Sequence, residues 1–140
     1  MHYSKILGFK GRWANEFQTQ SLDRFVGAYV RENRSGRTSH DSFPGVVVHA
    51  EQANESAGQA YALHLGWSGN HHVRVEEQFF GCAYAQLGEL FYPGELSLKP
   101  GESYCSPVLY GASSARGFSD LSRYPSAGRN RKLFLRGWPS

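Results

Sequence analysis

The sequence has few of the features that mark secreted, membrane-spanning or metal-binding proteins. It has two cysteines in 140 residues, Cys82 and Cys105, and they lack the CxxC spacing of a zinc site or a redox pair. No apolar run approaches the roughly 20 residues that a membrane-spanning helix needs. The N-terminus has no apolar segment typical of a signal peptide. We therefore expect a cytoplasmic protein with reduced thiols, no metal, no cofactor and no membrane partner.

Acidic residues are missing from the end of the chain. Five basic residues occur from Arg123 onward, which leaves 10 Lys and Arg against 12 Asp and Glu in residues 1–122, a net charge of −2. The overall charge of +3 thus comes from a short tail, whereas nucleic-acid-binding domains have their charge on the folded surface. We expect no nucleic acid partner. Residues 125–140 also contain two prolines and no apolar periodicity, which predicts an unstructured, non-native tail.

Residues 1–124 have the composition of a folded β-domain. Aromatic residues make up 14% of the chain and there are 16 glycines, a combination that favours strands joined by tight turns. Apolar runs separated by turn-forming residues predict strands at 25–30, 43–49, 61–67, 71–80, 81–87, 96–98 and 106–111. Seven short strands at this spacing predict an all-β fold, an antiparallel β-sandwich.

A short helix is predicted after the last strand. Residues 117–124 have Ser119 as a plausible N-cap, and Phe118 is placed to staple against Ser122 or Arg123. Pro125 then ends the helix. The C-terminal part is therefore expected to be short helix or disordered tail.

Several strings, in this order and spacing, resemble the N-terminal domain of the family 36 α-galactosidases. The resemblance covers about residues 5–124, and its most specific element is the Gly-Arg-Thr-Ser-His run. The strings are Gly11-Arg12-Trp13-Ala14-Asn15-Glu16-Phe17, Ser35-Gly36-Arg37-Thr38-Ser39-His40, Ser68-Gly69-Asn70, Gln86-Leu87-Gly88, Leu98-Lys99-Pro100-Gly101-Glu102-Ser103 and Gly117-Phe118-Ser119-Asp120-Leu121-Ser122-Arg123.

The resemblance implies that residues 1–124 are part of a larger sandwich, a partial supersandwich, that precedes a catalytic (β/α)₈ barrel. The family's catalytic aspartates lie in barrel motifs, a Lys-Trp-Asp strand end and a Cys-Ser-Gly-Gly segment, and neither motif occurs here. We therefore expect a fragment that is truncated at both ends and is inactive alone. A frameshift or premature end in the gene is a hypothesis for the abrupt departure at Pro125.

The residues themselves offer little catalytic chemistry. Glu76 and Glu77 are the only adjacent carboxylates, and neighbours on a strand point to opposite faces, so they do not flank one glycosidic bond. Consecutive residues at 39–41 do not align as a hydrolytic triad. His71 and His72 diverge on a strand and lack a third metal ligand, so we expect one to point inward and one to face solvent.

Sugar binding or contact with the barrel is the more plausible role for exposed residues. Aromatic faces and planar polar groups hold sugars, and by resemblance the candidates at that contact are Arg37, His40, Trp67 and Asn70. The predicted function is a non-catalytic domain fragment of an α-galactosidase that acts on melibiose and raffinose, supporting barrel packing and homo-oligomer assembly. The alternatives are a stand-alone carbohydrate-binding sandwich and a functionless product of a broken gene.

Overall fold

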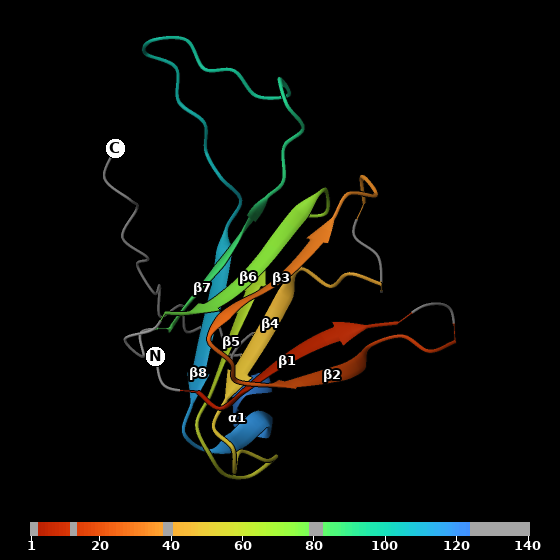
Figure 1. Ribbon diagram of the computed structural model, residues 1–140, viewed down its shortest axis with the longest axis vertical. Coiled ribbons are helices and arrows are strands. Elements are labelled where there is room, and N and C mark those ends of the chain that lie inside the picture. Colours follow the sequence, from red (N-terminus) through yellow and green to blue (C-terminus); the bar gives the residue numbers. More distant parts are fainter. Residues whose placement is uncertain (1–2, 12–13, 38–40, 79–82, 124–140) are drawn as a thin grey trace.

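The computed structural model describes residues 3–11, 14–37, 41–78 and 83–123. In these ranges the chain forms eight strands and one helix (Figure 1). In chain order they are β1 (Lys5–Lys10), β2 (Gln18–Asp23), β3 (Gly27–Asn33), β4 (Gly45–His49), β5 (Ala60–Leu65), β6 (His71–Glu77), β7 (Ala83–Glu89), β8 (Leu109–Ser114) and α1 (Gly117–Arg123).

The strands make two antiparallel sheets. The larger has the order β2-β1-β4-β5-β8 and the smaller the order β3-β6-β7. The all-β class and the antiparallel two-sheet architecture expected from the sequence are therefore confirmed. In the described residues the edge strands of the larger sheet are β2 and β8, and those of the smaller sheet are β3 and β7.

The core lies between the two sheets. On β4 and on β6 its fully buried side chains lie two residues apart, which is the period of a strand with one buried face. The buried side chains of the core are Tyr3, Ile6, Val46, Val48, Val73 and Val75. The strand β6 shows the alternation most clearly, because every second residue from His71 to Glu77 is buried.

The helix α1 covers one end of the larger sheet on the face away from the core. Phe118 packs edge-on against the His49 ring at 5.1 Å, and Leu121 is buried. The predicted N-cap at Ser119 is wrong, because α1 begins at Gly117 and the Ser119 hydroxyl donates to Glu55. The first three helical N–H groups, those of Gly117, Phe118 and Ser119, donate to the backbone carbonyls of residues 58, 54 and 55, which a local cap signal does not reveal.

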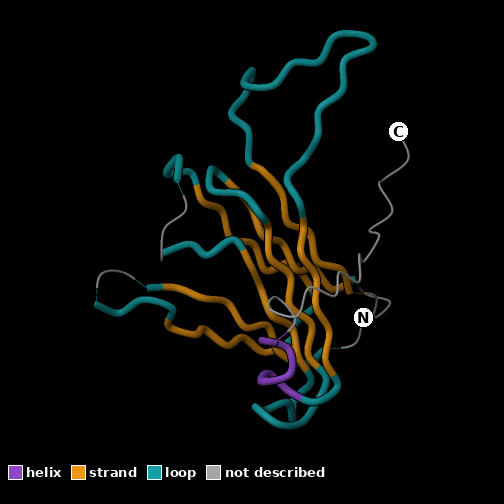
Figure 2. Tube along the Cα trace, turned by 180° about the vertical axis from the view of Figure 1, so that it is seen from behind, coloured by secondary structure: helices purple, strands orange, loops and turns teal. Residues whose placement is uncertain are grey.

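Residues 90–108 form a long arm that connects β7 to β8 and extends from the end of the molecule opposite α1 (Figures 1 and 2). Two matched turns shape it, each with a glycine at positive φ, at Gly94 (82°) and Gly101 (89°). In each turn the Glu that follows the glycine accepts a hydrogen bond from the N–H three residues earlier. The strand predicted at 96–98 is wrong, because in the described residues no neighbouring strand lies there to pair with it.

Two predictions lie outside the described residues. One is the unstructured tail at 125–140. The other is the boundary between the strands predicted at 71–80 and 81–87. Among the residues that are described, no helix is long and apolar enough to cross a membrane.

Candidate functional site

A polar turn at the end of β3 is held by one buried side chain. Asn33, 5% exposed, accepts hydrogen bonds from the Ser35 N–H (3.0 Å) and the Ser35 hydroxyl (2.5 Å). Its amide nitrogen donates to the Arg37 carbonyl at 2.8 Å. These contacts close the turn around Gly36, which has a φ of 75°. Arg37 is thereby presented at the exposed surface on a fixed backbone.

The loop before β6 is joined to this turn. The Asn70 side-chain oxygen accepts a hydrogen bond from the Gly36 N–H at 2.7 Å, and the Asn70 carbonyl accepts one from the Trp67 indole at 3.1 Å. Trp67 remains 41% exposed. Asn70 thus connects the turn that bears Arg37 to the loop that bears Trp67.

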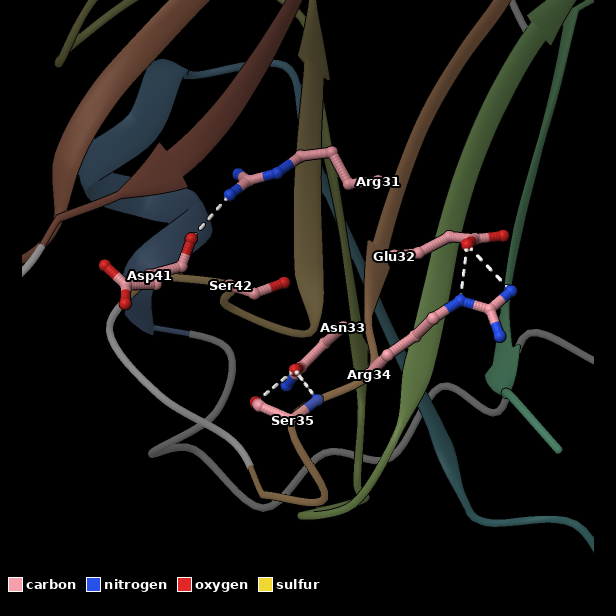
Figure 3. Close-up of a pocket in the computed structure, with 7 residues that line it drawn as sticks. All are labelled: Arg31, Glu32, Asn33, Arg34, Ser35, Asp41 and Ser42. Atoms are coloured by element: carbon pink, nitrogen blue, oxygen red, sulfur yellow. Dashed lines mark hydrogen bonds and ion pairs between the residues drawn. The ribbon is translucent and has the colours of Figure 1, made fainter. Parts of the chain in front are cut away.

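An open groove of about 560 Å³ lies beside the turn, between the end of β3 and the segment that leads into β4 (Figure 3). The Arg31 guanidinium spans it, donating to the carbonyls of Phe9 (2.5 Å) and Asp41 (2.8 Å). Arg34 pairs with Glu32 on the other side, at 3.0 Å. The groove is therefore lined by hydrogen-bonding groups of both charges, a lining that suits hydroxyl-rich ligands better than a single strong anion.

A row of rings crosses the outer face of the larger sheet at the same end of the sandwich. Phe43 stacks on His64 at 5.1 Å, and His64 stacks on Tyr110 at 6.2 Å. Burial lowers the pKa of His64 below its ordinary value, so the ring is neutral near pH 7. A second hollow of about 410 Å³ lies where the row meets Trp67.

His71 lies beneath the site. It is 1% exposed, and its Nδ1 is 3.0 Å from the Gly69 carbonyl. Burial lowers its pKa. The expectation that one of the two histidines points inward is confirmed; His72, next to it, is half-buried against Gly88.

Three of the four candidate residues, Arg37, Trp67 and Asn70, lie together on one rim of the sandwich, while His40 lies outside the described residues. Asn33, whose side chain organises the turn, was not among the residues predicted from the sequence. An Asn two residues before a Ser and three before a Gly is a recognisable Asx-turn signal, and it was available from the sequence.

The carboxylates on β6 are separated as expected. Glu77 is 6% exposed and forms a bidentate ion pair with Arg24, whereas Glu76 points to the other face and pairs with Arg74 at 2.5 Å. The hydrogen bond from Arg74 lowers the pKa of Glu76. Both carboxylates are therefore occupied in ion pairs. In the described ranges, no three His, Cys, Asp or Glu side chains gather as a metal site would require.

Several known proteins are similar to this chain in sequence and in fold. The family profile described as "Glycosyl hydrolase family 36 N-terminal domain" matches residues 2–99. The α-galactosidase of Escherichia coli is 41% identical over 119 residues, covering 85% of this chain and 17% of that enzyme. The crystal structure of the α-galactosidase AgaA from Geobacillus stearothermophilus superposes with a TM-score of 0.78 at 27% identity, covering 86% of this chain and 17% of AgaA.

Two other matching crystal structures are of AgaA variants in complex with stachyose and with raffinose. The chain spans about one sixth of the length of the curated relatives that it matches. The resemblance read from the sequence motifs is confirmed, because the family profile covers most of the chain. This chain belongs to the glycosyl hydrolase family 36 N-terminal domain family.

Proposed function

We propose that this chain is a non-catalytic part of an α-galactosidase, and that the rim formed by Arg37, Asn70 and Trp67 contacts the catalytic part of the enzyme. The relatives that it matches are α-galactosidases, and the match covers only about one sixth of their length. The sugars of such an enzyme, α-galactosides of the raffinose type, reach this chain through the intact enzyme. Homo-oligomer assembly is a further role of the same domain.

The observation that carries this proposal is the pre-organised rim. Asn33, at the end of β3, and Asn70, in the loop before β6, both hold the turn at Gly36, so the backbone that bears Arg37 is fixed before any partner binds. Fixed contact residues lose less conformational entropy on binding than mobile ones do. A turn of exposed residues with this many supporting hydrogen bonds is better suited to making a contact than to a purely connecting role.

A chimaera tests the proposal. The matching 119-residue stretch of the Escherichia coli enzyme is replaced by the corresponding stretch of this chain, and hydrolysis of raffinose is measured. We expect an active chimaera in which Arg37→Ala lowers kcat/KM roughly tenfold, the loss of one charged hydrogen bond. Gln52→Ala, an exposed substitution in the turn beside α1, is the matched control and leaves kcat/KM unchanged.

Two results would contradict the proposal. An active chimaera whose kcat/KM is unchanged by Arg37→Ala and by Trp67→Ala would show that the rim does not contact the catalytic part of the enzyme. Hydrolysis of a chromogenic α-galactoside by the 140-residue chain alone would overturn the non-catalytic assignment.

A stand-alone carbohydrate-binding module is the second candidate, and the exposed rings of Trp67 and Tyr110 favour it. Sugar platforms need ring faces that are open to solvent. The ring planes of Phe43 and His64 are 25° apart and those of His64 and Tyr110 are 29° apart, so the stacked faces of this row are turned toward one another. Trp67 and the outer face of Tyr110 offer the exposed ring surface. Isothermal titration of the chain with melibiose and raffinose decides: heat of binding that Trp67→Ala abolishes supports the module.

A further inference from the structure

The four edge strands of the described fold differ in how they are protected against pairing. Edge strands that must stay unpaired usually have charged side chains, prolines or bulges. The edge strands β2, β3 and β7 each contain at least one charged residue, whereas β8 (Leu109–Ser114) contains none and no proline. Within the described residues, β8 is therefore the edge most open to pairing with another strand.

The register of β8 on β5 shows which of its backbone groups face outward. Val108 accepts a hydrogen bond from the Gly66 N–H at 2.8 Å, and its carbonyl therefore points toward β5. Backbone groups alternate in direction along a strand, so the N–H and C=O groups of Tyr110 and Ala112 also point toward β5. Those of Leu109, Gly111 and Ser113 point away from the sheet.

We propose that the outward edge of β8 pairs with β8 of a second copy of this chain, antiparallel, around a two-fold axis at Gly111. In this register Leu109 lies opposite Ser113 of the second copy, and Gly111 lies opposite Gly111. All three outward residues then exchange hydrogen bonds with their opposite residue, because each pair joins two outward-pointing residues. A register shifted by two residues toward Ser114, centred on Ala112, leaves the outward groups of Leu109 unpaired.

The side chains suit this register. Tyr110, 56% exposed, falls opposite Ala112 of the second copy, whose small side chain leaves room for the ring. Val108, 60% exposed, falls opposite Ser114. Gly111 on the axis has no side chain to collide with its counterpart. The pairing therefore places two of the most exposed apolar side chains, Tyr110 and Val108, against the second copy. Ser114 donates to Asp120 of α1, so Val108 meets the second copy beside its helix.

The most suitable partner for the outward edge of β8 is β8 of a second copy of this chain. An antiparallel edge is self-complementary about a two-fold axis, so it needs no second sequence to fit it. Like charges opposite one another would oppose such pairing, and β8 has no charge to place there. The other edge of the same sheet, β2, ends at the charged Asp23, and all its residues except Leu22 are polar.

Sedimentation velocity of the 140-residue chain over a wide concentration range tests the pairing. We expect the mass of two chains, and we expect Ser113→Lys to give the mass of one chain, because the new charge would lie against Leu109 of the second copy. Ser113 is exposed in the single chain, so circular dichroism should show an unchanged fold. Ser21→Lys, the same change at an exposed position of β2, is the matched control and should leave the dimer intact.

Hydrogen exchange provides a readout that depends on the register. The amides of Leu109, Gly111 and Ser113 should exchange more slowly as concentration rises, while those of Tyr110 and Ala112, already bonded to β5, should not change. A chain that stays monomeric at every concentration overturns the proposal. So does a dimer, or a larger assembly, that survives Ser113→Lys.

Discussion

Replacing Asn33 tests whether the rim is held as the hydrogen bonds indicate. Asn33→Ala removes two bonds from Ser35 and one to Arg37. Because Ser35 and Arg37 are exposed, water replaces Asn33 at their polar groups, and each lost bond costs only its net value of about 0.5–1.5 kcal/mol. The free energy of unfolding should therefore fall by about 3 kcal/mol, since three bonds are lost. Asn70→Ala, which removes the single side-chain bond to Gly36, should cost about 1 kcal/mol.

Urea denaturation followed by circular dichroism measures these differences, with unchanged m-values as the check that the unfolded state is the same. Hydrogen exchange at Ser35 and Gly36 reports the turn directly and should speed up in both variants. Gln52→Ala, exposed and far from the rim, should change neither quantity. A loss of stability in Asn70→Ala as large as that in Asn33→Ala would contradict these roles for the hydrogen bonds. So would a loss in Asn33→Ala smaller than that in the Gln52→Ala control.

Three further perturbations test the core, the titrating histidines and the helix. Val75→Ala, at 1% exposure, should cost about 2 kcal/mol in urea denaturation, whereas Val30→Ala, at 47% exposure in the same sheet, should cost under about 0.5 kcal/mol. Because burial lowers the pKa of His64, the unfolded chain takes up protons first, so stability should fall as pH drops below about 6.5; His64→Phe should make that fall shallower. Gly117→Ala, whose Cβ would lie 2.3 Å from the Asn54 carbonyl oxygen, should lower Tm markedly in calorimetry.

Strands with apolar alternation were predictable because burial fixes their pattern. The alternation on β6 predicted that strand, and the Val-rich run predicted β4. The hairpin of β1 and β2 was not predicted, because β2 is mostly polar and exposed, and its strand structure comes from pairing with β1 rather than from its own residues. Propensity alone does not reveal a strand of that kind.

In the arm, by contrast, a strand was predicted at 96–98 where none forms. Leu96 and Leu98 alternate with polar residues as in a strand, and the turns around them are where the Pro-Gly pairs predicted. Yet a strand exists only when a neighbour supplies its hydrogen bonds, and in the described residues none lies beside this segment. The local pattern was correct about the conformation of the turns, and it contained no information about the missing partner.

The candidate site, too, was predictable where it depends on local turns and not where it depends on strand pairing. The sequence placed Arg37, Trp67 and Asn70 on or beside turns, which required only local signals. What makes them one rim is the bond between Asn70 and the Gly36 N–H, across 34 positions of the chain. That bond depends on β3 and β6 pairing so that Asn33 lies opposite His71, which brings the two loops to the same end of the smaller sheet. A pairing register is set by the burial of both strands together. Residue types and local turns therefore predict candidate contact residues, and only the β3–β6 pairing register shows which of them lie together.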